Sequence, residues 1–486
     1  MENNISKIKP EIVWKNFYAL TQIPRPSKKE GKAIEFVKEF GEKLGLETIV
    51  DHVGNVIIKK PATKGMENRK GVILQGHVDM VPQKNADKVH DFEKDPIEAY
   101  VDGDWVTANG TTLGADNGIG VAAAMAVLEA TDIEHGPVEA LFTMDEETGM
   151  TGANELKAGV LDGDILMNLD SEDEGELYIG CAGGINTSAT FDFTYEAAPE
   201  GFTAFNVSVT GLKGGHSGLD IPLKRGNANL IMNRLLINAN EHYGLLLHEI
   251  NGGSLRNAIP RESFATVAVP AKEVDAFKAL AVETEDYYKQ IITDDPNLKI
   301  SIEAANMPSQ FIDAKTFDNM LNAIHFCPNG VIKWMKDMPE VVETSTNLAI
   351  VKSENKQVKV LMLQRSSVEE SKEELCNKLK ENFEKYGAKV EFSGDYPGWE
   401  PNTNSDILNT MKEVYNNKYG KIPEVKVIHA GLECGILGAT YPNWDMISFG
   451  PTIRFPHSPD EKINIETVGK FWDYLVETLK NIPVKS

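Results

Sequence analysis

Apolar residues follow two different patterns along this chain, and the first pattern predicts a layered α/β structure. Up to about residue 180, the short apolar runs 71–80 (GVILQGHVDM), 138–144 (VEALFTM) and 164–169 (DILMNL) are bounded by polar or glycine-containing turns. Such runs are typical of buried strands. The segment NGIGVAAAMAVLEA, between the first two runs, predicts a helix whose small residues allow close packing on a sheet.

Near residue 185 the pattern changes to longer alternating stretches, 187–195 and 204–209, followed by a helical segment over 227–242. From residue 401 the first pattern resumes and predicts a strand over 444–449 and a helix over 465–479. Glycine and proline cluster at both transitions. We therefore predict a discontinuous α/β catalytic domain, residues 1–183 and 399–486, interrupted by an α+β domain, residues 184–398. An insertion of this length could contain two diverged copies of a smaller unit.

Composition excludes several classes of function. The formal net charge is −24, from 49 Lys and Arg against 73 Asp and Glu, so no basic surface for nucleic acid is expected. The four cysteines form no CxxC pair, which argues against a disulfide framework and against a thiolate zinc site. The longest apolar run, 121–128, is too short to span a membrane, and the start lacks the apolar core of a secretory signal. We expect a cytoplasmic protein without a membrane partner.

Residues capable of metal chemistry follow the predicted strands. His77 and Asp79 lie two positions apart in GHVD, so in an extended segment both would face the same side, where Asp79 could accept the ring N–H of His77. Asp116 precedes the helix of small residues, and it could either cap that helix or bind a metal. Taken singly, each of these residues also has an ordinary structural interpretation.

Three more acidic residues and one histidine complete the set. Glu146 and Glu147 follow the run 138–144, Asp170 ends the run 164–169, and His457 precedes the last helix. In open α/β sheets, ligands collect at the carboxyl ends of the strands, where most of these residues are expected. Histidine and carboxylate donors together suit zinc, cobalt or manganese, and one shared carboxylate could bridge two ions.

Five motifs in this order, GHVD, LGADNG, DEETG, NLDSE and FPHSPDEKI, resemble the M20 metallopeptidases, and most closely their aminoacyl-histidine (Xaa-His) dipeptidase branch. The resemblance implies a zinc-exopeptidase-like catalytic domain with an inserted lid and dimerisation domain. It implies two divalent metal ions, most consistent with Zn²⁺, although Co²⁺ or Mn²⁺ would also suit the donors. One ion would be held by His77 and Asp170 and the other by Glu147 and His457, with Asp116 between them.

The same resemblance implies three catalytic roles. Asp79 would orient His77, and Glu146 would be the general base that takes a proton from the attacking water. His216, in GLKGGHSG of the inserted domain, would stabilise the oxyanion, so catalysis should require closure of that domain over a short substrate.

Three further positions match substrate-binding residues of the family. Asn257 would hold the substrate backbone, Arg365 its C-terminal carboxylate and Glu433 its α-amine. The expected function is hydrolysis of short peptides, with Xaa-His and carnosine-like dipeptides as substrates. A tripeptide aminopeptidase, an N-acyl amino acid deacylase and a non-catalytic binding protein are the alternatives. We expect a homodimer, and whether His216 acts in its own subunit or across the dimer stays open.

Overall fold

The computed structural model describes residues 4–485, and the chain divides into two compact units. Unit 1 contains the described residues up to Cys181, Trp399–Val427 and those from Leu432 onward. Unit 2 contains Ala182–Gly398 together with Ile428–Gly431. The predicted junctions at 183/184 and 398/399 lie within two residues of these boundaries, but the return of 428–431 to unit 2 was not predicted.

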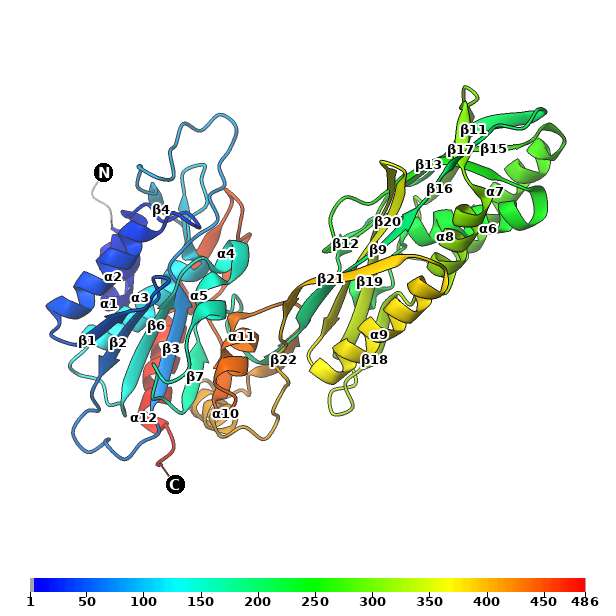
Figure 1. Ribbon diagram of the computed structural model, residues 1–486. Helices are drawn as coiled ribbons and strands as arrows, with labels where there is room; N and C mark the ends of the chain where they lie inside the picture. Colours follow the sequence, from blue (N-terminus) through cyan, green and yellow to red (C-terminus); the bar gives the residue numbers. More distant parts are fainter. Residues whose placement is uncertain (1–3, 486) are drawn as a thin grey trace. The chain divides into compact units, whose positions relative to one another are not determined.

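Unit 1 is built on an eight-stranded sheet in the order β1-β2-β6-β3-β7-β23-β8-β22 (Figure 1). These strands are β1 (Glu47–Val50), β2 (Val56–Lys60), β3 (Val72–His77), β6 (Val138–Thr143), β7 (Ile165–Asn168), β8 (Glu176–Cys181), β22 (Glu424–Ile428) and β23 (Asp445–Ser448). The neighbours β6, β3, β7 and β23 run parallel. Their carboxyl ends therefore meet at one edge, where ligands collect in sheets of this kind.

A smaller sheet in the same unit has the order β24-β25-β5-β4. Its strands are β4 (Ala99–Asp102), β5 (Trp105–Ala108), β24 (Ile453–Arg454) and β25 (Lys462–Asn464). The helices of unit 1 are η1 (Ile5–Lys7), α1 (Glu11–Thr21), α2 (Gly31–Lys43), α3 (Ala115–Glu129), α4 (Glu146–Gly149), α5 (Thr151–Glu155), α10 (Asp406–Tyr419), α11 (Glu433–Thr440) and α12 (Ile465–Asn481). Helix α3 lies against β3. Its Ala122, Ala123 and Ala124 are fully buried, as the small-residue pattern predicted.

The four predicted strands of unit 1 are present, but they are shorter than predicted. The run 71–80 forms a strand only over Val72–His77. Asp79 therefore lies in the loop after β3, not on the strand face shared with His77. The fold-class prediction, a mixed α/β catalytic unit with an inserted α+β domain, is confirmed.

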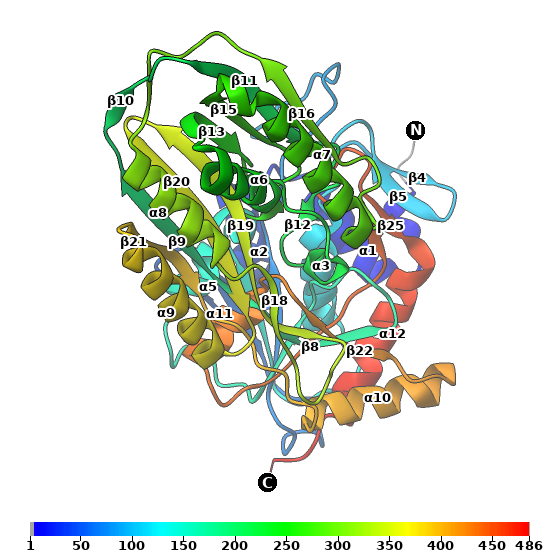
Figure 2. The same cartoon turned by 90° about the vertical axis from the view of Figure 1, so that its right-hand side faces the viewer.

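Unit 2 contains a nine-stranded sheet with the order β16-β11-β15-β13-β19-β20-β9-β21 and with β18 paired to β19. Its strands are β9 (Gly183–Asp192), β11 (Phe202–Thr210), β13 (Leu246–Gly252), β15 (Ser263–Pro270), β16 (Lys299–Ala304), β18 (Gly330–Trp334), β19 (Val342–Glu354), β20 (Gln357–Ser366) and β21 (Lys389–Tyr396). All of their pairings are antiparallel. Four helices lie on one face of this sheet (Figure 2): α6 (Ala228–Tyr243), α7 (Val274–Ile291), α8 (Ala314–His325) and α9 (Glu369–Lys385).

The topology of unit 2 is repeated. The sequence β11-α6-β13-β15-α7-β16 and the sequence β9-α8-β19-β20-α9-β21 share one β-α-β-β-α-β order, and the two halves meet where β13 pairs with β19. Within each half, the strands have the same spatial order, with the last strand at the sheet edge. This arrangement fits the hypothesis of two copies of a smaller unit.

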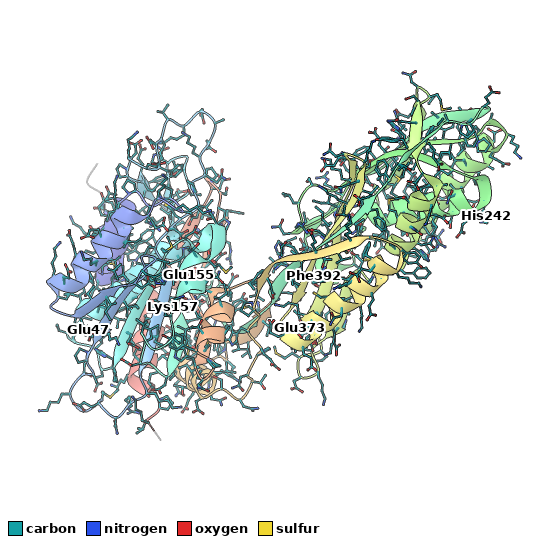
Figure 3. All side chains as sticks on the ribbon, in the orientation of Figure 1. Glu47, Glu155, Lys157, His242, Glu373 and Phe392 are labelled. Atoms are coloured by element: carbon teal, nitrogen blue, oxygen red, sulfur yellow. The ribbon has the colours of Figure 1, made fainter. Side chains whose placement is uncertain are left out.

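The remaining elements of unit 2 are short. They are β10 (Tyr195–Ala197) paired with β17 (Gln310–Ile312), β12 (Gly215–His216) paired with β14 (Ala258–Ile259), η2 (Ile221–Leu223) and η3 (Ala271–Glu273). Exposed charged side chains cover the outside of each unit, among them Glu155 and Lys157 in unit 1 and Glu373 on α9 in unit 2 (Figure 3). Within residues 4–485, no helix is both long enough and apolar enough to cross a membrane.

Candidate metal centre

Five predicted ligands converge at the carboxyl edge of the unit 1 sheet. His77 is the last residue of β3, Asp116 lies at the start of α3, and Glu147 follows β6 in α4. Asp170 follows β7 by two residues, and His457 lies in the loop between β24 and β25. Among the described residues, donor atoms lie within 4.8 Å of one another in three groups: His77 with Asp116 and Asp170, Asp116 with Glu147 and His457, and His77 with Glu146 and Glu147. Asp116 belongs to the first two groups.

Asp116 directs one carboxylate oxygen toward each histidine. Its Oδ1 lies 3.1 Å from His77 Nε2, and its Oδ2 lies 3.1 Å from His457 Nε2. Burial acts to raise the pKa of Asp116, but the contacts with both histidines lower it below its usual value. A carboxylate shared in this way has the arrangement of a ligand that bridges two cations.

His77 is fully buried and surrounded by acidic groups. Asp79 Oδ1 lies 3.2 Å from its Nδ1, while Asp170 Oδ1 lies 3.5 Å from its Nε2. Burial alone would lower the pKa of His77, but Asp170, Asp116 and Asp79 raise it well above its usual value. The acidic surroundings therefore favour a positive charge at this position.

Asp79 is itself held by neighbours. Its carboxylate accepts hydrogen bonds from Ser27 Oγ (2.7 Å) and from the backbone N–H groups of Glu146 (3.0 Å) and Glu147 (3.3 Å). Burial opposes ionisation, but His77, Ser27 and the Glu146 N–H together lower the pKa of Asp79 to about 2. Asp79 therefore joins the His77 loop to the segment that carries both glutamates.

Glu147 and His457 form the second side of the cluster. Glu147 Oε2 lies 3.0 Å from His457 Nε2, and hydrogen bonds to Asp116 and Glu147 raise the pKa of His457 to about 11. His457 adopts a left-handed backbone conformation with φ 58°, which is uncommon for a residue other than glycine.

Two buried carboxylate oxygens in the cluster accept no hydrogen bond from the described residues 4–485, namely Glu147 Oε1 and Asp170 Oδ1. Asp170 Oδ1 has an ion-pair contact with His77 Nε2 at 3.5 Å. Burial, followed by the neighbouring carboxylates, raises the pKa of Asp170 to about 7 despite the opposing effect of His77. Buried carboxylate oxygens without donors are costly unless a cation satisfies them, so the donor set fits a pair of metal ions.

Two glutamates lie beside the ligands. Glu146 Oε2 is 3.9 Å from His77 Nε2, and burial raises its pKa well above the usual value. Glu433, at the start of α11, accepts hydrogen bonds at Oε2 from Gln75 (2.6 Å) and Thr143 (2.8 Å). Its Oε1 is buried and has no partner in the described part of the chain. Burial raises the pKa of Glu433 to about 7.

The profile of Peptidase family M20/M25/M40 matches residues 73–481, a span that includes the whole cluster. The chain belongs to this family. It is 46% identical over 484 residues to the cytosol non-specific dipeptidase of Escherichia coli (strain K12), an alignment that covers 99% of this chain and 100% of that relative. The crystal structure of aminoacylhistidine dipeptidase from Vibrio alginolyticus has a TM-score of 0.95 at 48% identity, covering 100% of this chain and 99% of that one. The family resemblance and the predicted enzyme class, a peptidase, are thus confirmed.

The fold alone extends to a solved structure of much lower sequence identity. Aminopeptidase PepT from Bacillus cereus ATCC 10987 has a TM-score of 0.58 at 17% identity, and 98% of this chain and 99% of that chain are covered. This fold is therefore shared with an aminopeptidase whose sequence differs widely from this one.

The three remaining predicted residues of this peptidase lie in unit 2. His216 is in β12, and Asn257 directly precedes β14, the strand that pairs with β12. Asn257 O accepts a hydrogen bond from Ser217 N at 2.9 Å. Arg365, on β20, is buried and donates from Nη1 to the Tyr396 hydroxyl at 3.0 Å. Its charge contributes to lowering the pKa of His216, so the two side chains belong to one polar group.

The hydrogen bonds of His216 define its tautomer. His216 Nδ1 accepts backbone N–H groups from Gly218 (3.2 Å) and Leu219 (3.1 Å), so that nitrogen carries no proton. Burial and the charge of Arg365 lower the pKa of His216, while Asp220 opposes them. The imidazole is therefore neutral, with its proton on Nε2, and that nitrogen can donate a hydrogen bond.

Several residues around these sites were not predicted from the sequence. Ser27 and Thr143 orient Asp79 and Glu433, while His429 bonds to Ser345 (2.8 Å) within unit 2. Glu172, which follows Asp170 by two positions, is buried enough that its pKa rises to about 8. Glu172 lies in the acidic segment 171–174, and only the fold reveals that this side chain is partly buried beside the cluster.

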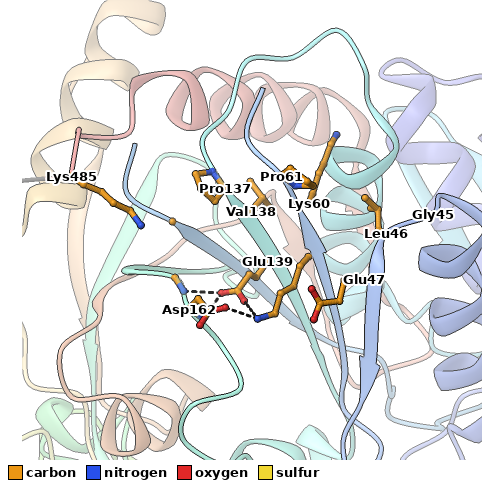
Figure 4. A pocket seen from close by; sticks show the side chains of 13 residues that line it. Gly45, Leu46, Glu47, Lys60, Pro61, Pro137, Val138, Glu139, Asp162 and Lys485 are labelled. Carbon is orange, nitrogen blue, oxygen red and sulfur yellow. Dashed lines mark hydrogen bonds and ion pairs between the residues drawn. The ribbon is translucent and has the colours of Figure 1, made fainter. Parts of the chain in front are cut away.

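A separate cavity of about 350 Å³ lies at the opposite edge of the unit 1 sheet, near the start of β6 (Figure 4). Within it, Lys59 Nζ is 3.0 Å from Glu139 Oε1 and 2.7 Å from Asp162 Oδ2. The charges at this edge compensate one another. The cavity therefore lacks the cluster of histidine and carboxylate groups that distinguishes the metal centre.

Proposed function

We propose that this protein is a metal-dependent dipeptidase whose reaction centre is the unit 1 cluster and whose substrates include Xaa-His dipeptides. The observation that carries the proposal is Asp116, with one oxygen 3.1 Å from each histidine and an acidic partner beyond each one. Two ions would share Asp116, one held also by His77 and Asp170 and the other by Glu147 and His457. The names of the Escherichia coli and Vibrio alginolyticus relatives support the substrate class.

The donor chemistry favours Zn²⁺, with Co²⁺ or Mn²⁺ as alternatives, because imidazole nitrogen and carboxylate oxygen suit all three. When bound, such ions acidify a water molecule and polarise a peptide carbonyl. If metal ions replaced the protons on His77 and His457, they would also bind the two buried oxygens that accept no hydrogen bond, on Glu147 and Asp170.

Glu146 is the proposed general base. Its carboxylate lies close to His77 and Glu147 but is not grouped with Asp116, the residue that the two proposed ions would share. Burial raises the pKa of Glu146, and a general base works best when its pKa lies near the pH at which the enzyme acts. Glu146 would take the proton of the attacking water and return it to the departing amine.

Glu433 is the proposed partner of the substrate α-amine. Gln75 and Thr143 fix one of its oxygens, and the other is buried without a partner among the residues described, so an ammonium group would complete its coordination. This feature favours substrates with a free amine over N-acyl amino acids. Arg365 would bind the C-terminal carboxylate, and Asn257 would bind the peptide backbone.

His216 is the proposed oxyanion donor. Its Nδ1 accepts hydrogen bonds from two backbone N–H groups. Its Nε2–H is therefore left to donate to the oxygen that becomes negative in the tetrahedral intermediate. Activity would then depend on unit 2 as well as on unit 1. Small-angle scattering with a bound inhibitor tests the associated closure hypothesis, which fails if no compaction occurs and His216→Ala is fully active.

A substrate panel tests the proposed specificity. The purified protein, supplied with Zn²⁺, Co²⁺ or Mn²⁺, is assayed on Xaa-His dipeptides, β-Ala-His, other dipeptides, tripeptides and acetylated amino acids. We expect dipeptides, including Xaa-His, to be cleaved fastest. Preferential cleavage of tripeptides or acetylated amino acids would assign the protein to another specificity, and no hydrolysis with any of the metals would contradict the enzymatic function.

The site of action is proposed to be the cytoplasm, on the basis of the name of the Escherichia coli relative. Cell fractionation followed by immunodetection tests this, and recovery in the membrane or secreted fraction would contradict it.

A further inference from the structure

Glu461 is a buried carboxylate that binds four consecutive backbone N–H groups. Its Oε2 accepts from Leu113 (2.7 Å) and Gly114 (2.9 Å), and its Oε1 accepts from Ala115 (2.7 Å) and Asp116 (3.2 Å). Only 2% of the side chain is exposed. These amides lead into α3, where backbone N–H groups have no partner within the helix and the helix dipole favours a negative charge. Glu461 therefore determines the path of the loop that carries Asp116.

Arg25 holds the same loop from the carbonyl side. Its Nη2 donates to Gly114 O at 2.5 Å, and its Nη1 donates to Val78 O (3.0 Å) and Asp79 O (2.9 Å). The side chain is 1% exposed. One guanidinium group thus ties the loop after His77 to the loop before Asp116.

Gly114 leaves the space that this contact requires. Its φ of 73° is left-handed, and a Cβ at this position would meet Arg25 Nη2 at 2.5 Å. A glycine is therefore needed for the close approach of Arg25 to the loop as well as for the backbone conformation.

The two charged residues link three separate segments. Arg25 contacts the loop after β3, Glu461 follows His457 by four positions, and both converge on residues 113–116. The three segments carry His77, Asp116 and His457. Both side chains bond to backbone atoms rather than to the cluster's donor atoms, so their effect on the cluster is geometric. The negative charge of Glu461 also reduces the cost of burying Arg25.

We propose that Arg25 and Glu461 act together as positioning residues that hold the loops of His77, Asp116 and His457 at the spacing required for two metal ions. The inference rests on the metal centre of the proposed function. Groups that orient metal ligands typically contribute about 10- to 100-fold to metal affinity, and these two residues act in the same way through the backbone.

The test uses Glu461→Gln, which preserves the size of the side chain but places an amide N–H₂ against two of the four backbone N–H groups. We expect about 10-fold or greater weakening of Zn²⁺ and Co²⁺ affinity in chelator competition, together with an altered Co²⁺ absorption spectrum. In the metal-free full-length protein, amide hydrogen exchange over residues 113–116 should become faster. Glu461→Asp, which keeps the carboxylate, should recover part of the affinity.

Arg25→Lys is the second variant, because it retains the positive charge but lacks the guanidinium fork, and it should weaken metal affinity without greatly changing KM at saturating metal. Glu466→Gln is the control, since Glu466 lies five residues from Glu461 and pairs with Lys470 on the exposed surface.

Unchanged metal affinity and unchanged exchange in folded Glu461→Gln and Arg25→Lys would overturn the proposal. If the wild-type protein itself bound no metal, the proposed function would fail first, so the two failures are distinguishable.

Discussion

The acidic cluster of unit 1 and the polar group of unit 2 place the same residue type in opposite electrostatic environments. In unit 1, carboxylates raise the pKa of His77 well above its usual value and that of His457 to about 11. In unit 2, burial and Arg365 lower the pKa of His216, and burial, Arg365 and His216 lower that of His429 to about 3. The neighbours of a histidine, and not the residue itself, determine its charge.

The contrast assigns different chemistry to the two groups. The unit 1 cluster, with its donor-free buried oxygens, favours bound cations. The unit 2 group combines neutral imidazoles with a guanidinium, and this combination favours a negatively charged oxygen. A dipeptidase needs both kinds of group, since it must acidify water and must stabilise an oxyanion.

The largest expected effect tests the base in unit 1. Glu146→Gln should lower kcat by at least about 10³-fold, because the amide cannot accept the proton of water. Metal content, measured by elemental analysis, should stay at the wild-type value because Glu146 is not among the five proposed ligands. Near-normal turnover in this variant would remove Glu146 from the role.

The next effect tests the donor in unit 2. His216→Ala should lower kcat by about 10²- to 10³-fold, the usual range for loss of one oxyanion donor, with metal stoichiometry unchanged. Steady-state kinetics and metal analysis on the same sample check this. A fall in metal content instead would place His216 among the metal-binding groups and would break the comparison between the two units.

A smaller and more selective effect is expected at Glu433. Glu433→Gln should weaken kcat/KM for dipeptides by about 10- to 100-fold, through loss of a charge-assisted hydrogen bond to the α-amine. Residual activity on acetylated dipeptides, which lack that ammonium, should be unaffected. An equal loss on both substrates would show that Glu433 supports the cluster and does not recognise the amine.

The smallest effect concerns stability and pH. His429 is buried, and its pKa in the folded protein, about 3, lies below the value of about 6.5 for unfolded histidine. Its contribution to stability is thus complete above pH 6.5 and is lost as pH falls toward 3, at up to about 1.4 kcal/mol per pH unit. His429→Asn should flatten the decline in unfolding free energy between pH 6.5 and 3, measured by urea denaturation. A slope identical to that of the wild type would contradict the shift.

Much of the unit 1 site was predictable because local patterns determine it. The apolar runs ended near His77, Glu147 and Asp170, and parallel strands bring such ends together at one edge. The end of β3 was less predictable: residues 78–80 are apolar enough to continue a strand, but Arg25 and Ser27 hold them as a loop.

The positioning residues could not be predicted from the sequence. Arg25 contacts backbone atoms as far as 89 residues away, and Glu461 contacts backbone atoms that are 345 to 348 residues away. Hydrogen bonds to the backbone leave no side-chain pattern to detect in the sequence. The tautomer of His216 similarly depends on two N–H groups whose direction is determined by the turn after β12. Long-range backbone contacts are thus the part of the site that required the structure.

Metal stoichiometry tests the central claim most directly. The full-length protein is stripped with a chelator, reloaded with Zn²⁺, freed of excess metal and analysed beside Asp116→Ala treated in the same way. The shared position of Asp116 predicts about two ions per wild-type chain and loss of stoichiometric binding in the variant. A wild-type chain without stoichiometric metal, or an Asp116→Ala variant that still binds two ions, would contradict the account.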